Sequence, residues 1–513
     1  MGETGLLPGW WPRMIACANR MGLTREPDVK EGEPPGPVAP PLWPLVVALP
    51  SLTGGLWAWW AVQGGLLGVI LGVLPGVSLL SSSLSNVFSG GDARISQFMT
   101  MGAFLGMLLS FPMVLASGLE AGVVLLILSS ASFVASGYLA VGEVPVPAGV
   151  PKPRMGVRLS TRSAADEVAM FSIVLTTRPL VVGPRAARVG REIDEALEVF
   201  GENGWLDDPE SYHRKPPPVE GFGHRRQRHK GWDLEHLSFE SGYEPWPDEP
   251  GRERWLSQAP NRTAHALVLR HPGGPRPWLV CIHGLRDGSP QKSPDLFQPE
   301  YLHRELGLNL LFPFLPLHGP RKAGLLSGER LLSGEMVELV HTGAQAVWDI
   351  RRLLGWLRLP DQGALAVGVL GHSLGGFAAA LLCGLVQGEE GVDCVIAANP
   401  SVDPSLMFWR DGLSMATRYL KTAGVTQKKT DLLLRAVSPL ALEPRVAKER
   451  RAILASVADR IIPAGEPESL WRHWDRPRVL WHQGNHFGLL RSAEGKAAVE
   501  DVLRDSDIVR RRT

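Results

Sequence analysis

The sequence predicts an α/β protein, preceded by an all-α region that is apolar enough to lie in a membrane. Three observations predict this architecture. The stretch 44–142 of the 513-residue chain carries only three charged residues, Asp92, Arg94 and Glu120. From about residue 233 onward, strand-like and helix-like segments alternate, which is typical of a mostly parallel sheet covered on both faces. A Gly-His-Ser-Leu-Gly sequence stands where one of these strands meets a helix.

The average composition hides this division. The formal net charge is +1, 20% of the residues are charged, and the mean hydropathy is +0.01. A chain of this length is expected to hold two or more domains. The neutral balance argues against a nucleic-acid-binding protein, whose domain is usually strongly basic. The four cysteines are widely spaced and form no metal-binding pattern, so we expect free thiols, no metal and no cofactor.

The region 44–142 predicts three or four transmembrane helices. No charge occurs from Pro44 to Gly91, and one span needs about 20 predominantly apolar residues. This run fits one long span near Trp57–Leu80 or two spans that meet at Gln63–Gly65. Two further spans are predicted, at Phe98–Gly118 and Ala121–Gly142. The alternative, a buried helical domain of a soluble protein, is disfavoured because soluble helices normally keep one polar face.

Loop charges predict the orientation of these spans. Lys and Arg accumulate in short cytoplasmic loops. With four spans, all the cations that flank the helices lie on one side, and with three spans most lie on the C-terminal side. Both counts place the C-terminal part in the cytoplasm. The segment 1–43 is charged and proline-rich and lacks the apolar core of a signal peptide.

The segment 143–232 is predicted to connect the membrane region to the alternating part. Residues 143–155 are proline-rich and indicate a stiff linker. Two amphipathic helices are expected near 163–177 and 185–202. The run His224–Lys230 carries four cations and two histidines. It is either a solvated loop or a segment that contacts anionic lipid headgroups.

The alternating part begins at about residue 233. Its expected strands are apolar or alternating runs: Leu237–Tyr243, Ala264–Arg270, Trp278–Ile282, Asn309–Phe314, Ala364–Leu370, Cys394–Ala398, Ala452–Val457 and Arg478–Trp481. A helix is expected at about 335–358, where apolar residues recur at helical spacing. A second, alanine-rich helix is expected from Leu374 to about Val386.

The segment Gly371-His372-Ser373-Leu374-Gly375 has the G-x-S-x-G pattern of a nucleophile elbow. The strand must end and the helix must begin within one tight turn, which forces the serine into a strained backbone conformation. The two glycines leave room for the close approach of neighbouring chain segments. Ser373 would then present its hydroxyl at the helix N-terminus, which favours negative charge. We therefore predict that Ser373 is a catalytic nucleophile.

A serine hydroxyl needs a base, and the base needs an acid to orient it. His486 lies in a glycine-flanked loop after the last strand and is favoured over His482, which lies within or beside that strand. For the acid, Asp459 follows the strand 452–457 and is favoured over Asp403, which follows the preceding strand. The structural alternative for either carboxylate is to cap a helix.

The negative charge that develops on a substrate oxygen needs fixed N–H donors. Leu374 directly follows the nucleophile and is one candidate donor. His283-Gly284 ends an early strand, and the backbone N–H of Leu285 after it is the second. The side chain of His283 is expected to have a structural role.

The segment 233–513 resembles the α/β-hydrolase superfamily. The matching residues follow the superfamily's chain order: His283-Gly284, Gly371–Gly375, Asp459–Pro463 and Gly484–His486. The resemblance implies an eight-stranded α/β-hydrolase sheet with a helical cap, here at about 404–450. Four large apolar residues of that insertion either line a substrate pocket or pack ordinarily: Met407, Phe408, Trp409 and Met415.

Together these features favour a membrane-anchored serine hydrolase that cleaves carboxylic esters through a Ser-Asp-His triad and an acyl-enzyme. The expected partners are membrane lipids and an apolar or acyl-ester substrate, which could itself be a lipid. No cofactor and no nucleic acid are expected. Two alternatives remain: a peptidase or amidase of the same fold, because the same triad cleaves amides, and a catalytically silent binding module tethered to the membrane.

Overall fold

The computed structural model describes residues 43–89, 93–176, 183–288, 293–331, 333–386, 388–411 and 414–509. The predictions for the charged N-terminal segment 1–43 therefore lie almost wholly outside the described residues. The chain forms two compact units. The first holds the residues up to Ser172 with two short segments, Val457–Pro463 and Gln483–His486. The second holds Ile173–Ser456, Ala464–His482 and the chain from Phe487 onward.

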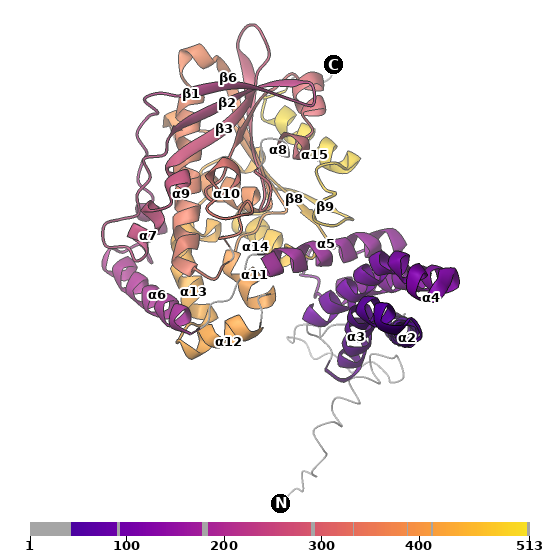
Figure 1. Ribbon diagram of the computed structural model, residues 1–513. Coiled ribbons are helices and arrows are strands. Elements are labelled where there is room, and N and C mark those ends of the chain that lie inside the picture. The colour runs from indigo at the N-terminus through magenta and orange to yellow at the C-terminus, as the bar shows by residue number, and fades with distance from the viewer. Residues whose placement is uncertain are drawn as a thin grey trace, which may run out of the picture. The chain divides into compact units, whose positions relative to one another are not determined.

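The N-terminal region is helical (Figure 1). Its helices are α2 (Trp43–Gln63), α3 (Gly65–Ser89), α4 (Ala93–Gly142) and α5 (Val157–Thr176). The charge-free run forms two helices that separate at Gly64, not one long helix. Gly118 interrupts α4 with a non-helical backbone (φ 88°, ψ 169°), so α4 consists of two helical stretches. Among the described residues, three segments are long and apolar enough to cross a membrane: Leu45–Gln63, Gly65–Asn86 and Arg94–Gly142.

The interior of α2, α3 and α4 combines buried apolar side chains, such as Leu79 and Leu125, with buried hydroxyl groups, while many large apolar side chains lie on the outer surface. Their hydroxyl groups pair across helices: Thr53 Oγ1 lies 2.9 Å from Ser132 Oγ, and Trp57 Nε1 donates to Ser129 Oγ at 3.0 Å. By contrast, Leu115 is 83% exposed and is one of many large apolar side chains on the outer surface. This distribution suits helices surrounded by lipid, where small and hydroxyl residues pack between helices.

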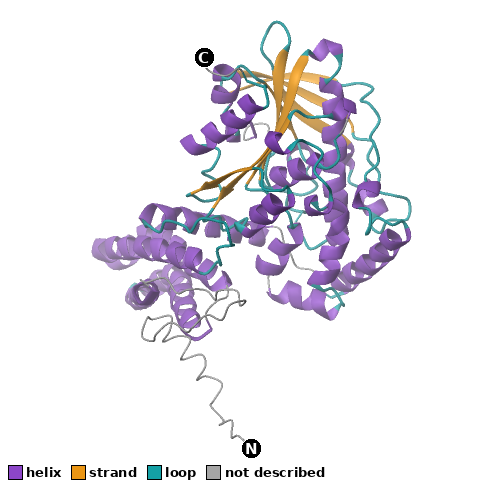
Figure 2. Cartoon of the chain, turned by 180° about the vertical axis from the view of Figure 1, so that it is seen from behind, coloured by secondary structure: helices purple, strands orange, loops and turns teal. Residues whose placement is uncertain are grey.

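The second unit is built on a nine-stranded sheet of order β1-β2-β3-β5-β4-β6-β7-β8-β9 (Figure 2). The strands are β1 (Gly223–His229), β2 (Trp232–Glu240), β3 (Thr263–Leu269), β4 (Arg276–Ile282), β5 (Asn309–Pro313), β6 (Ala364–His372), β7 (Cys394–Ala398), β8 (Arg451–Ser456) and β9 (Arg478–His482). The first three strands and β5 pair antiparallel, and β5, β4 and β6 to β9 pair parallel. Every strand expected from the sequence is present; β7 has the expected ends, and the others differ at one or both ends.

The ninth strand, β1, forms from the basic run that the sequence suggested to be a loop. It pairs with β2 through a two-residue turn, Lys230-Gly231, in which both residues have positive φ (46° and 84°). Such a turn matches the twist of a hairpin. The exposed arginines of β1, such as Arg225 and Arg226, cover an edge that would otherwise pair with another chain. The basic run is therefore a strand and not a loop, and its contact with anionic lipid remains a prediction.

Helices cover both faces of the sheet (Figures 1 and 2). They are α6 (Pro184–Glu202), α7 (Arg252–Leu256), α8 (Ser293–Leu296), α9 (Met336–Leu357), α10 (Leu374–Cys383), α11 (Pro404–Asp411), α12 (Ser414–Thr422), α13 (Gln427–Leu434), α14 (Gly465–His473) and α15 (Ala493–Asp505). Alternate residues of β4 belong to two core clusters: Val280 to the one that includes residues of α6, α9 and α10, and Cys281 to the one that includes residues of α15. The helices α11, α12 and α13 form the insertion between β7 and β8.

Candidate active site

Ser373 is the single residue between β6 and α10. Its backbone has φ 58° and ψ −117°, a strained conformation for a residue other than glycine. The N–H of Ser373 donates to the carbonyl of Ala398 at the end of β7, at 2.8 Å. Its hydroxyl therefore belongs to a rigid turn at the carboxyl end of a central strand, as the motif predicted.

The two glycines of the elbow are required by close backbone contacts. A Cβ atom at Gly371 would lie 2.0 Å from the carbonyl oxygen of Gly375. A Cβ atom at Gly375 would lie 2.0 Å from the carbonyl oxygen of Ile282. Neither position can hold a side chain without moving backbone, so the sequence pattern is a packing requirement of this turn.

The candidate acid and base form a buried pair. Asp459 lies in the loop after β8, and His486 lies in the loop after β9. The distance from Asp459 Oδ2 to His486 Nδ1 is 2.6 Å, and both side chains are at most 4% exposed. The other oxygen of Asp459 accepts the N–H groups of Ile461 and Ile462, each at 2.8 Å. Because a carboxylate oxygen only accepts, this contact favours the tautomer of His486 that carries its proton on Nδ1.

The rival residues have structural partners. His482 ends β9, and its Nδ1 lies 2.9 Å from Glu494 Oε2 on α15. Asp403 Oδ1 accepts the N–H and hydroxyl of Ser405 and the N–H of Leu406, so it caps the N-terminus of α11. Both rivals are thereby engaged away from the Asp459–His486 pair.

The predicted oxyanion loop adjoins the elbow. A Cβ atom at Gly284 would lie only 3.2 Å from Ser373 Cβ, so the backbone of this loop passes beside the candidate nucleophile. Leu285 follows and is half-buried, and Leu374 is the first residue of α10. The N–H groups of these two residues remain the predicted donors.

His283 has the structural role expected of it. Its Nε2 accepts the N–H of Leu315 at 3.1 Å, and its Nδ1 donates to the carbonyl of Gly284 at 2.8 Å. Burial lowers the pKa of His283 to about 4, so the ring is neutral at physiological pH. This histidine holds the start of the oxyanion loop in place.

A small apolar pocket of about 20 Å³ lies beside the elbow. It is lined by residues of α9, α10 and neighbouring loops: Leu315, Leu331, Leu339, Thr342, Gly343, Ala346, Leu374, Phe377, Ala378 and Pro404. From the cap, only Pro404 is among these lining residues. Phe408 is buried in the core, and Trp409 Nε1 donates to Thr430 within the cap. The side chains of Met407 and Met415 lie outside the described part of the chain.

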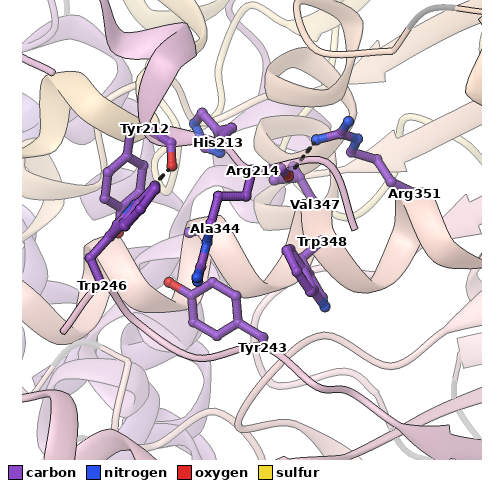
Figure 3. A pocket seen from close by; sticks show the side chains of 9 residues that line it. All are labelled: Tyr212, His213, Arg214, Tyr243, Trp246, Ala344, Val347, Trp348 and Arg351. Carbon is purple, nitrogen blue, oxygen red and sulfur yellow. Dashed lines mark hydrogen bonds between the residues drawn. The ribbon is translucent and has the colours of Figure 1, made fainter. Parts of the chain in front are cut away.

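A second pocket is an aromatic cage occupied by the chain's own cation (Figure 3). The guanidinium of Arg214 lies 4.6 Å from the ring centre of Trp246 and 5.6 Å from that of Trp348. Arg351 on α9 donates to the carbonyl of Arg214 at 3.1 Å (Figure 3). These contacts fasten the segment before β1 to α9, and we assign the cage a structural role.

Metal-ligating residues do not cluster within the described part of the chain. No group of three or more His, Cys, Asp or Glu side chains there is arranged to hold a metal ion. Cys281, Cys383 and Cys394 are buried and form no disulfide, and Cys17 lies outside the described residues.

The sequence did not identify Asp166, which lies on α5 and contacts the Asp459–His486 loops. Its carboxylate accepts the backbone N–H of His486 at 3.0 Å. The available signal was a pair of adjacent acidic residues, Asp166-Glu167, in a helix otherwise free of them. A pair of carboxylates on an amphipathic helix ordinarily faces solvent, and both are buried here.

Comparison with known proteins places the chain in a family. No family model matches it. Two uncharacterized proteins of Mycobacterium tuberculosis, MT2702 of strain CDC 1551 / Oshkosh and Rv2627c of strain ATCC 25618 / H37Rv, are each 36% identical to it over 364 residues. The match covers 71% of this chain and 86% of each relative.

Solved structures include similar folds with little sequence identity. Acetyl xylan esterase 1 from Thermoanaerobacterium sp. JW/SL YS485 is 14% identical, with a TM-score of 0.40, over 59% of this chain and 93% of that one. The acylaminoacyl peptidase of Pyrococcus horikoshii is 15% identical, with a TM-score of 0.36, over 57% of this chain and 50% of that one. The strand order and the elbow between β6 and α10 define the α/β-hydrolase fold of the second unit. The chain therefore belongs to the same protein family as the two mycobacterial proteins, and carries an α/β-hydrolase fold behind an apolar helical region.

Proposed function

We propose that this protein is a membrane-anchored serine hydrolase that cleaves carboxylic esters with an apolar acyl group. The observation that carries the proposal is the buried 2.6 Å contact between Asp459 and His486, in a fold whose serine sits on a strained elbow. The candidate nucleophile, acid and base follow β6, β8 and β9. Because these strands are parallel, their carboxyl ends lie at the same edge of the sheet.

In the proposed reaction, the hydroxyl oxygen of Ser373 attacks the ester carbonyl carbon while His486 Nε2 takes its proton. The N–H groups of Leu374 and Leu285 stabilise the oxyanion that forms. The bond between the carbonyl carbon and the alcohol oxygen then breaks, and His486 returns the proton to the leaving alcohol. A water molecule, deprotonated by His486 Nε2, then attacks the carbonyl carbon of the acyl-enzyme. The bond from that carbon to Ser373 Oγ breaks, His486 returns the proton to Ser373, and the carboxylic acid is released.

The pocket beside the elbow supports an apolar acyl group as the specificity element. Leu374 contributes both to this pocket and, through its N–H, to the predicted oxyanion site. The lining includes no charged side chain, and Thr342 carries its one hydroxyl group. A hydrocarbon chain would gain about 0.8 kcal/mol for each CH₂ group that it buries there. The amine of a peptide substrate would find no carboxylate among these residues, which favours an ester over a peptide.

The test is a substrate panel with the full-length protein in detergent micelles. p-Nitrophenyl esters from acetyl to dodecanoyl are compared with peptide p-nitroanilides, using wild type and Ser373→Ala. We expect ester turnover that is greatest for medium or long acyl chains, and a loss of at least about 10³-fold in Ser373→Ala. Turnover of anilides without esters would identify a peptidase. Folded wild-type protein with no turnover of either class would support the binding-module alternative.

A further inference from the structure

Helix α5 is joined by hydrogen bonds to both loops that carry the candidate acid and base. The hydroxyl of Ser163 donates to the carbonyl of Ala458 at 3.2 Å, and Asn485 Nδ2 donates to the carbonyl of Arg162 at 3.2 Å. Asp166 lies one turn further along the same helix face. The helix therefore contacts the β8 loop and the β9 loop with one face.

Asp166 is the centre of this contact. Its Oδ2 accepts the N–H of His486 at 3.0 Å and the N–H of Arg460 at 3.2 Å, and its Oδ1 accepts Asn485 Nδ2 at 2.7 Å. The side chain of Asp166 is fully buried. One carboxylate thus binds donors from both loops, immediately beside the residues Asp459 and His486. Fixing the backbone of His486 limits where its ring can lie.

A second buried contact joins the same elements. Arg460 Nε lies 2.5 Å from Glu167 Oε1, and the two side chains are 5% and 1% exposed. Breaking a buried ion pair is costly, because one charge is left without its partner. A Cβ atom at Gly137 would lie only 1.9 Å from the carbonyl of Ser160, so α5 packs directly on the end of α4. The position of α5 is therefore fixed by the β8 loop through Arg460 and by α4 through Gly137.

We propose that Asp166 is a positioning residue for the acid–base pair, supplied by the helix that follows the membrane region. It holds the β9 loop so that His486 meets Asp459 in a productive orientation. The inference rests on the proposed function, because it assigns the pair a role in hydrolysis. It also assigns α5 to the catalytic apparatus and not to a passive linker.

The charge of Asp166 also acts on His486. Burial and the neighbouring Asp459 raise the pKa of Asp166 to about 7, and His486 opposes this shift. The other charged groups at this contact are Arg460 and Glu167. Above pH 7 Asp166 is ionised and favours the protonated imidazole. Removal of this charge should therefore lower the pH at which His486 loses its proton and becomes an active base.

The test compares full-length Asp166→Asn with wild type, and with Glu195→Gln, a control that removes an exposed charge from α6. The asparagine keeps the shape of the side chain and can still accept from the two backbone N–H groups. For the best ester substrate we expect kcat to fall about tenfold with KM changed less than about twofold. The acid limb of the pH–rate profile should move to lower pH by about 0.5–1 unit. Glu195→Gln should match wild type.

The proposal would be overturned if folded Asp166→Asn had the kcat and the pH profile of wild type. The same holds if its melting temperature fell while kcat and the pH profile stayed unchanged. If that variant does not fold, Asn485→Ala serves as the second variant, because it removes one of the three donors to Asp166. It should lower kcat about two- to fivefold at constant KM, and unchanged kcat would contradict the proposal. Ester turnover by wild type and its loss in Ser373→Ala test the proposed hydrolase function on their own. If they hold while Asp166→Asn behaves as wild type, only the role of Asp166 is contradicted.

Discussion

At the scale of single residues, three carboxylates lie in or near the loops after the strands. Their hydrogen-bond partners show which of them contacts a histidine. Asp459 shares its oxygens between its own loop and the ring of His486. Asp403 uses one oxygen to cap α11. Glu466 accepts the hydroxyl of Ser401 and the N–H of Val402, and burial raises its pKa to about 7. Only the first of these arrangements orients an imidazole.

This difference predicts unlike effects for two matched substitutions. Asp459→Asn should lower kcat by about 10³–10⁴-fold, because the tautomer and the stabilising charge of His486 are lost. Asp403→Asn should leave kcat within about twofold. Asp403→Ala should lower the free energy of unfolding by about 1 kcal/mol through loss of the α11 cap. Steady-state kinetics check the two Asp→Asn variants, and thermal melts check Asp403→Ala. A large kcat loss in Asp403→Asn would contradict the choice of Asp459 over Asp403 as the catalytic acid.

The sequence could suggest Ser373, Asp459 and His486 because each stands in a short motif after a strand. Asp166 could not be found this way. It lies 320 residues from His486 in the chain, and the contact depends on how α5 folds back on the loops. The periodicity of apolar residues predicts a single helix or strand. It does not predict a contact between residues that are far apart in the sequence.

At the scale of elements, the apolar runs of the parallel strands were predicted well, because buried parallel strands are continuously hydrophobic. The strand β1 was missed because its residues are almost all polar and it is itself the edge strand of the sheet. Its signal was the Lys230-Gly231 turn, a short hairpin loop. The break at Gly118 in α4 was anticipated by the neighbouring Glu120.

The pocket lined by α9 and α10 is expected to limit the size of the acyl group. Ala346 lines the pocket from α9, so Ala346→Leu should fill part of it. The ratio of kcat/KM for octanoyl over acetyl esters should fall at least about tenfold, while acetyl ester turnover stays within about threefold of wild type. Stability should fall by about 1–3 kcal/mol from overpacking. Ala187→Leu, at an exposed position of α6, is the control. An unchanged ratio would exclude this pocket as the acyl site.

At the scale of the whole molecule, the uneven charge distribution reflects two chemical environments. The helices α2 to α4 expose many large apolar side chains on their outer surface and pair hydroxyl groups between helices, unlike the surface of a soluble protein. The α/β unit buries two layers of aliphatic residues around its sheet.

This division predicts how the protein behaves in cells. The full chain should stay in the membrane pellet after alkaline carbonate washing and should be released by detergent, because three segments suffice to cross a bilayer. A C-terminal fluorescent protein should be fluorescent and a C-terminal alkaline phosphatase inactive, as the positive loops predict. Release by carbonate would contradict the membrane anchor, and an active phosphatase fusion would reverse the predicted orientation.

The most direct test of the central claim is covalent labelling of the full-length protein with a fluorophosphonate, followed by mass spectrometry of its peptides. A serine made nucleophilic by a positioned histidine is the target of such a probe. We expect one adduct, on Ser373, that is absent in Ser373→Ala and forms at least about 10²-fold more slowly in His486→Ala. Folded wild-type protein that remains unlabelled, or carries the adduct on another residue, would contradict it.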